Sequence, residues 1–188
     1  MKLAFVVILI AASVSAQDSA PTSSPLSVCG PMSVKFQIKM ADTQSPNVTP
    51  EPGKALVYVI EDQQFKAAKD VIVRIGMDGA WVGATRGESY LSFAVEPGEH
   101  HLCANIMPGF LSTGRRVSLF GLTTEAGGVY YFRARTTGGP SSAMNRNGLD
   151  DTISIDLDLI NRDEGKLLVT YSSRSVSNAT SVKTEKGK

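Results

Sequence analysis

The chain has 188 residues, and its 19 basic side chains nearly balance its 18 acidic ones. A protein without a basic excess lacks the electrostatic footprint that binds phosphate backbones, so we expect no nucleic-acid partner. The same balance gives the chain no special affinity for an anionic membrane surface.

The N-terminus has the pattern of an export signal. Lys2 supplies a positive charge, and residues 3–12 form an apolar run that is too short to anchor the chain in a bilayer. Small residues at 14–16 fit the site that a signal peptidase reads, so we predict cleavage after Ala16; a buried N-terminal helix is the alternative. Loss of Lys2 would leave 18 basic residues, one fewer than 19, against 18 acidic ones. No later segment approaches the apolar length of a membrane helix, so we expect a periplasmic or extracellular protein.

Composition divides the rest of the chain into three parts. Residues 17–28 are rich in Ser, Pro and Ala, which predicts a disordered linker. Residues 29–172 have the size of one domain. Residues 173–188 end in lysines among Ser, Thr and Asn, a composition that predicts a disordered tail.

Several short segments have the pattern of β-strands. Apolar and polar residues alternate at 34–40, 71–77 and 153–159, as in half-buried strands. Residues 55–60 are apolar throughout, which is typical of a central strand covered on both faces. Further strands are expected at 80–82, 91–95, 102–106, 116–124 and 129–132.

Turn residues separate these segments. Asp78-Gly79 between apolar runs predicts a hairpin, because a type I′ turn needs positive φ at both central residues. Gly-Gly-Pro and Ser-Ser within residues 137–147 predict a long loop. Residues 163–169 form either a short helix or a last strand, and the acidic residues at their start favour the helix. Seven to nine short strands indicate an all-β fold, a β-sandwich or barrel.

Cys29 and Cys103 are the two cysteines of the chain. An even count in an exported protein favours a disulfide. The bond would close a loop of about 75 residues and add at most roughly 4.5 kcal/mol of stability. Two free thiols, or a metal site shared with the histidines, are the alternatives.

Residues 99–103 hold the one cluster of ligand-type side chains. Successive side chains of a strand point to opposite faces, so His101 shares a face with Cys103, and His100 shares one with Leu102. If Leu102 faces the core, His101 and Cys103 face outward. A zinc site needs about four ligands and the chain has only these two histidines, so a metal site at His100 and His101 is the weaker interpretation, and we expect no cofactor.

The sequence offers no complete catalytic set. No serine lies on a G-x-S-x-G elbow, although either histidine could act as a base in a triad. Asp156 and Asp158 alternate with apolar residues and are read as a solvated strand face. Trp81, just after the predicted hairpin turn, and His101 are the candidates for a binding surface.

Five strings resemble a family of uncharacterised bacterial exported proteins, known as a domain of unknown function. They are PEPGKALVYVI (50–60), GMDGAWVGATRGESY (76–90), PGEHHLCAN (97–105), AGGVYYFRAR (126–135) and DEGKLLVTYSSRSVS (163–177). The resemblance implies a bacterial envelope location and a single antiparallel β-sandwich similar to the transthyretin-like or carboxypeptidase-regulatory domains. It offers no catalytic residue to transfer. Some relatives resemble lipoproteins, whereas this chain has no cysteine at the cleavage site.

These observations predict a non-enzymatic exported protein that binds or scaffolds an envelope protein or glycan. A metal-binding or redox protein that uses the His-His-x-Cys cluster is the alternative, and an unrecognised hydrolase comes third.

Overall fold

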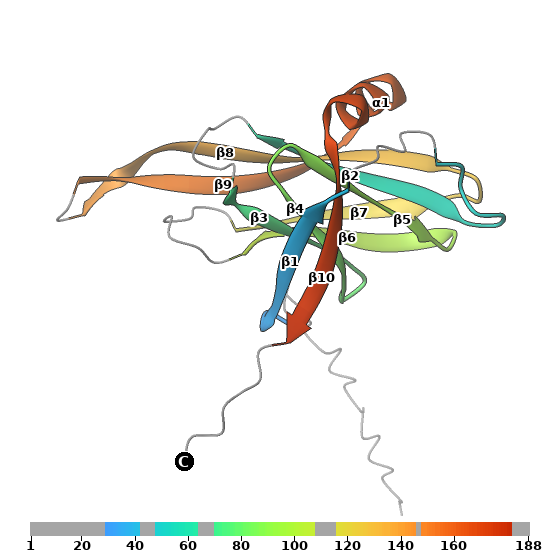
Figure 1. Cartoon of the computed structure of the whole chain (residues 1–188), viewed down its shortest axis with the longest axis horizontal. Helices are drawn as coiled ribbons and strands as arrows, with labels where there is room; N and C mark the ends of the chain where they lie inside the picture. The colour runs from blue at the N-terminus through green and yellow to red at the C-terminus, as the bar shows by residue number, and fades with distance from the viewer. Residues whose placement is uncertain (1–28, 42–47, 64–69, 108–115, 146–147, 182–188) are drawn as a thin grey trace, which may run out of the picture.

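The computed structural model describes residues 29–41, 48–63, 70–107, 116–145 and 148–181 (Figure 1). The predicted signal peptide (1–16) and linker (17–28) lie outside these residues, as does the end of the chain from residue 182.

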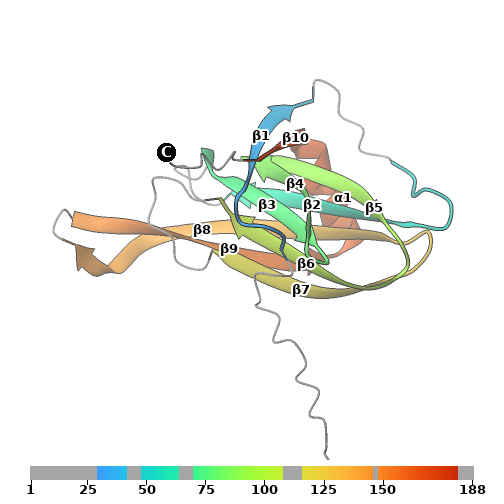
Figure 2. The same cartoon turned by 90° about the horizontal axis from the view of Figure 1, so that it is seen from below.

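Two β-sheets stack as the layers of a sandwich (Figure 2), which confirms the predicted all-β class. The six-stranded sheet has the order β1 (Val34–Met40), β10 (Ser173–Ser181), β5 (Ser89–Val95), β2 (Ala55–Gln63), β8 (Val129–Asn145) and β9 (Gly148–Ile160). The four-stranded sheet has the order β4 (Ala80–Arg86), β3 (Ile72–Met77), β6 (Gly98–Ile106) and β7 (Val117–Thr124). Most neighbours are antiparallel, but β2 with β8 and β10 with β5 are parallel.

The main core lies between the two sheets. Alternate residues of β3, β6 and β9, such as Ile75, Leu102 and Ile155, are fully buried there. Residues 55–60 of β2 are all apolar because they are covered on both faces: Val57 and Val59 point into this core, while Leu56, Tyr58 and Ile60 point to the other side. The central strand predicted from the apolar run is therefore confirmed.

The one α-helix of the described residues, α1 (Arg162–Tyr171), covers part of the outer face of the six-stranded sheet (Figure 1). The Asn161 side chain caps it by accepting from the Glu164 N–H, which confirms the helix favoured over a last strand. Val169 and Gly165 form its buried side. Val169 packs in a second cluster whose other buried members are Leu56, Tyr58, Ile60, Tyr90 and Tyr131.

The hairpin of β8 and β9 corrects the loop predicted at 137–147. Both strands continue well past the rest of the sheet, to Asn145 and from Gly148 (Figure 1). The ladder shifts register between Pro140 and Met144. Such a bulge accommodates a proline, which cannot donate a ladder hydrogen bond, so these turn-forming residues lie inside a strand pair rather than in a loop.

The tail predicted at 173–188 is also wrong as far as residue 181, because these residues form β10. Residues 175–181 of β10 pair with the whole of β1. Apolar and polar residues do not alternate in β10, because serine side chains make its contacts with β4. Ser175 Oγ donates to the Ala84 carbonyl at 2.7 Å, and Ser177 Oγ accepts from the Ala84 N–H at 3.0 Å. A strand held by hydroxyl and backbone bonds leaves no hydrophobic period to read.

Candidate functional site

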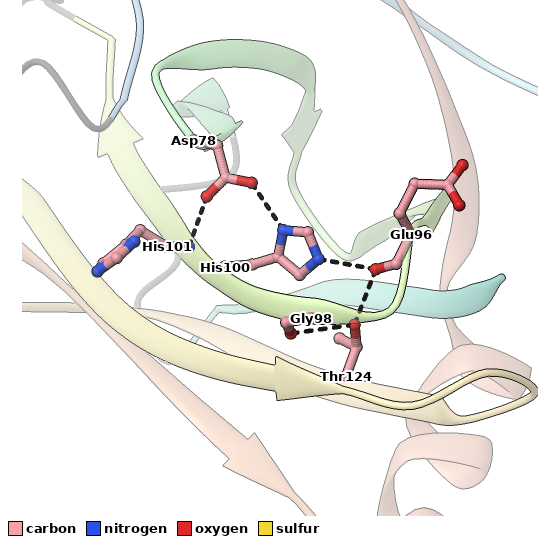
Figure 3. A network of polar contacts seen from close by, with 6 residues as sticks. All are labelled: Asp78, Glu96, Gly98, His100, His101 and Thr124. Atoms are coloured by element: carbon pink, nitrogen blue, oxygen red, sulfur yellow. Dashed lines mark hydrogen bonds and ion pairs between the residues drawn. The ribbon is translucent and has the colours of Figure 1, made fainter.

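The histidine cluster joins two turns of the four-stranded sheet (Figure 3). Asp78 lies in the β3–β4 hairpin turn with φ of 51°, and Gly79 follows with φ of 84°, as the predicted hairpin requires. His100 Nδ1 lies 2.7 Å from Asp78 Oδ2, and His100 Nε2 lies 2.8 Å from the Glu96 carbonyl oxygen. The other Asp78 oxygen accepts from the His101 N–H at 2.8 Å. His100 therefore bridges the turn before β4 and the turn before β6.

The partners of His100 fix its protonation state. A carboxylate and a carbonyl oxygen both accept hydrogen bonds, and this pair of partners favours the imidazolium form, in which both ring nitrogens donate. The bond to Asp78 accordingly raises the pKa of His100. Burial works to raise the pKa of Asp78, but the bonds from His100 and His101 prevail and lower it.

The signs of these shifts define a pH window. A raised His100 pKa means that its contribution to stability is complete below the unfolded value of about 6.5 and is lost as pH rises through the folded pKa. A lowered Asp78 pKa means that its contribution is lost only as pH falls through the folded value, below about 3.9. The pair therefore stabilises the fold most between these limits.

The predicted ligand cluster does not converge on one point. Leu102 is buried in the core, so His101 and Cys103 lie on the outer face, as the alternation predicted. The His100 and His101 rings point away from one another (Figure 3). Among the described residues, no group of three or more His, Cys, Asp or Glu side chains is placed to hold a metal ion. The geometry therefore gives no support to the metal-binding or redox alternative.

Cys29 and Cys103 form a disulfide with a Cα–Cα distance of 5.2 Å, which confirms the predicted pairing. The bond fastens residues 29–33, here called the N-terminal strap, across the outer face of the four-stranded sheet. Gly76 makes room for it, since a Cβ at this position would lie 2.9 Å from the Cys29 carbonyl carbon and closer still to its oxygen. Cys103 is thereby fully buried.

A buried arginine holds the other end of the strap. The Arg74 Nη1 donates to the carbonyls of Met32 at 3.1 Å and Val34 at 2.8 Å, and its Nε and Nη2 donate to the Asn105 side chain. Arg74 is 1% exposed, and this burial lowers its pKa. Its guanidinium also lies 4.6 Å from the centre of the Trp81 ring. Neutral acceptors and an aromatic face thus compensate a desolvated charge.

Trp81, a sequence-based candidate for the binding surface, belongs to this arrangement. Its indole Nε1 donates to the Pro31 carbonyl at 2.8 Å, and the ring is partly buried. The strap thus occupies one side of the ring. His101, the other candidate, is exposed, and its bonds to Asp78 are made by the backbone: its N–H donates to the Asp78 carboxylate, and its carbonyl accepts from the Asp78 N–H at 3.0 Å.

The sequence did not single out the surface around α1. Two large apolar side chains on this helix, Leu167 and Tyr171, are 56% and 78% exposed. They are one helical turn apart and lie on the same side of α1. Gly165 and Val169, at the same spacing, form its buried side. The sequence does hold a signal for this exposed apolar surface: the apolar residues of α1 occupy more than one face of the helix, so that some of them cannot be buried against the sheet.

Two hollows flank α1. One, of about 180 Å³, is lined by Ile60, Glu61, Asp62, Glu88, Leu168, Tyr171 and Ser172. The other, of about 230 Å³, is lined by Val48, Thr49, Pro50, Val129, Tyr131, Arg162 and Lys166. Three carboxylates border the first and two cations border the second, so the two ends of the helix differ in charge. We call the exposed side of α1 and these hollows the α1 face.

No family model, curated protein or solved structure matched the chain. The resemblance to the exported bacterial family therefore stays a prediction. No helix in the described part of the chain has the length and hydropathy needed to cross a membrane.

Proposed function

We propose that the chain is an exported, non-catalytic binding module of the bacterial cell envelope, and that it binds through the α1 face. The observation that carries this proposal is the exposure of Leu167 and Tyr171 on a firmly held helix. Exposed apolar side chains beside concave polar surface are typical of interaction sites.

The anchoring of α1 makes this surface suitable for recognition. Arg133 Nη1 lies 2.7 Å from Glu164 Oε1, which ties the first turn of the helix to β8. Gly165 allows the helix to rest directly on the Tyr131 ring. A rigid helix presents its outer side chains at little entropic cost, so the ligand would not have to order the surface.

The export half of the proposal is supported by the signal-like N-terminus and by the disulfide, which suits an oxidising compartment. It is tested by expressing the full chain in a bacterial host and measuring the intact mass of the protein in the periplasm. We expect loss of residues 1–16, a new N-terminus at Gln17 and one disulfide. Retention of residues 1–16, or two free thiols, would contradict export.

The binding half is tested by a screen of the exported protein against envelope glycans and envelope proteins. A ligand found in the screen should bind at least tenfold more weakly to Leu167→Ala/Tyr171→Ala. The control is Leu119→Ala/Val176→Ala, which truncates two side chains that are 43% and 44% exposed on other elements. We expect the control to bind as the wild type does.

The same screen tests the sequence-based candidate His101. The His101→Ala protein should keep its affinity if the α1 face is the binding surface, whereas selective loss in this variant would move the site to the four-stranded sheet. Turnover of any compound by the wild-type protein, with no ligand bound, would overturn the proposal as a whole.

A further inference from the structure

The hollow at the N-terminal end of α1 has the chemistry of an anion site. Arg162 and Lys166 line it together with Thr49, and none of the described residues that line it is acidic. The remaining walls are Val48, Pro50, Val129 and Tyr131, most of whose surface is apolar. The hollow therefore combines positive charge at one side with a non-polar wall at the other.

The two cations are unfavourably placed on the helix. Neither side chain makes a hydrogen bond or an ion pair with another described residue. Arg162 is the first residue of the helix, where the positive end of the helix dipole disfavours a cation. Arg162 and Lys166 also have the i, i+4 spacing at which like charges repel, by about 0.2–0.5 kcal/mol. An anion between them would reverse both unfavourable effects.

The neighbouring acidic residues do not neutralise this pair. Glu164 is held by Arg133 on the other side of the first turn. Asp163 is exposed, and it is not among the residues that line the hollow. The positive charge of the hollow is therefore available to a ligand.

Tyr131 is a further residue of the hollow that suits an anion. Its side chain is 5% exposed, yet it contributes to the lining of the hollow. Burial raises the pKa of Tyr131, and the charge of Arg162 opposes this effect, so the hydroxyl lies within electrostatic reach of the guanidinium. Its hydroxyl is a donor that a ligand oxyanion could use.

We propose that this hollow binds an oxyanion, a carboxylate or a phosphate, carried on a short apolar stem. Arg162 and Lys166 hold the charged group through charge-assisted bonds, and the stem lies along Val48, Pro50 and Val129. The proposal deepens the proposed function, on which it rests, because it places part of the ligand of the α1 face.

The test uses calorimetric titration of the exported protein in a buffer free of phosphate and carboxylate. The probes are hexanoate, hexyl phosphate, hexanol and inorganic phosphate. We expect hexanoate or hexyl phosphate to bind at least tenfold more tightly than hexanol and than inorganic phosphate. Whichever six-carbon anion is preferred identifies the carboxylate or the phosphate as the natural group. Equal affinity for all four probes would overturn the proposal.

The test variant is Arg162→Gln/Lys166→Gln, and the charge-matched control is Lys35→Gln/Arg116→Gln, which removes two exposed cations from other elements. Binding of the preferred anion should fall at least tenfold in the test variant and less than twofold in the control. The urea midpoint of the test variant should not fall, because the cations do not stabilise the helix. Equal weakening by both pairs would show general electrostatic attraction and overturn the site.

Failure of this proposal is distinguishable from failure of the proposed function. If Leu167→Ala/Tyr171→Ala abolishes binding of an envelope ligand while Arg162→Gln/Lys166→Gln leaves both that ligand and the six-carbon anions unaffected, the binding face stands and the anion site is wrong. If the anions bind at Arg162 and Lys166 but no envelope ligand depends on α1, the site exists without the proposed role.

Discussion

Substitution of Gly165 by alanine tests how α1 is held against the sheet. In an exposed helix this change would stabilise the protein by about 1 kcal/mol, because glycine is a poor helix former. Here the added Cβ would lie 2.5 Å from the Cβ and Cδ1 of Tyr131, and closer still to its Cγ. The Tyr131 Cβ is bonded directly to the main chain, so a change of rotamer cannot relieve its contact with the added Cβ.

The packing around Tyr131 prevents an easy adjustment. Its ring is stacked on Tyr58 with a centroid distance of 4.9 Å, and both side chains are buried. Overpacking of this kind costs about 1–3 kcal/mol, and contact with rigid atoms favours the upper end. After subtracting the helix-propensity gain, we expect Gly165→Ala to lower the free energy of unfolding by about 2 kcal/mol.

Urea unfolding followed by circular dichroism measures this change. With a slope of about 2 kcal/mol/M, the midpoint should fall by about 1 M. Thr170→Ala is the control, because Thr170 is exposed on the same helix and its hydroxyl bonds only to the Lys166 carbonyl. Its midpoint should change by less than about 0.3 M. A higher midpoint for Gly165→Ala would refute the reasoning, since α1 would then not rest on Tyr131.

Three further predictions concern the four-stranded sheet. Cys29→Ser/Cys103→Ser should lower the free energy of unfolding, by at most about 4.5 kcal/mol, in urea titrations that compare it with the oxidised wild type; an unchanged midpoint would contradict the role of the strap. Arg74→Met should cost about 3 kcal/mol in the same assay, because it leaves the Met32 and Val34 carbonyls without their donor, and a neutral result would show that water replaces the guanidinium. NMR titration should give His100 a pKa above 6.5 that falls in Asp78→Asn, and wild-type stability should decline between pH 6 and pH 9 more steeply than that of His100→Gln; parallel pH profiles would exclude the ionised pair.

Local patterns in the sequence predicted most of the sandwich. β9 is an example: Ile153, Ile155 and Leu157 alternate with polar residues and are all buried in the core. The Asp78-Gly79 turn was equally predictable, because its positive φ values restrict the residues that can occupy it. Such features depend on near neighbours in the chain, and hydrophobic periodicity and turn chemistry report them directly.

Features that depend on distant segments were not predictable. The parallel pairing of β2 with β8 places Leu56 opposite Val129. All four strands of the other sheet lie between these two strands in the chain, and no local pattern encodes so distant a partner. Arg74 reads as an ordinary polar residue in an alternating strand, yet it is buried beneath the strap because Met32 and Val34 supply acceptors. The sequence correctly predicted that the ligand-type residues around His100 lie on one strand. It did not predict that His100 and His101 bond to Asp78, which lies in the turn of another hairpin.

The strand order explains how α1 comes to lie on the outer face of the six-stranded sheet. α1 connects β9 to β10, which lie on opposite sides of β8, β2 and β5 in the six-stranded sheet. This connection passes over the outer face of the sheet, and the buried side of the helix shields the second apolar cluster. The fold therefore accounts for Gly165 and Val169. It does not account for the exposure of Leu167 and Tyr171, or for two cations at the i, i+4 spacing near the N-terminus of the helix, where their placement is unfavourable. These side chains lie together on the crossover helix of the described residues, and for this reason we propose the α1 face as the binding surface.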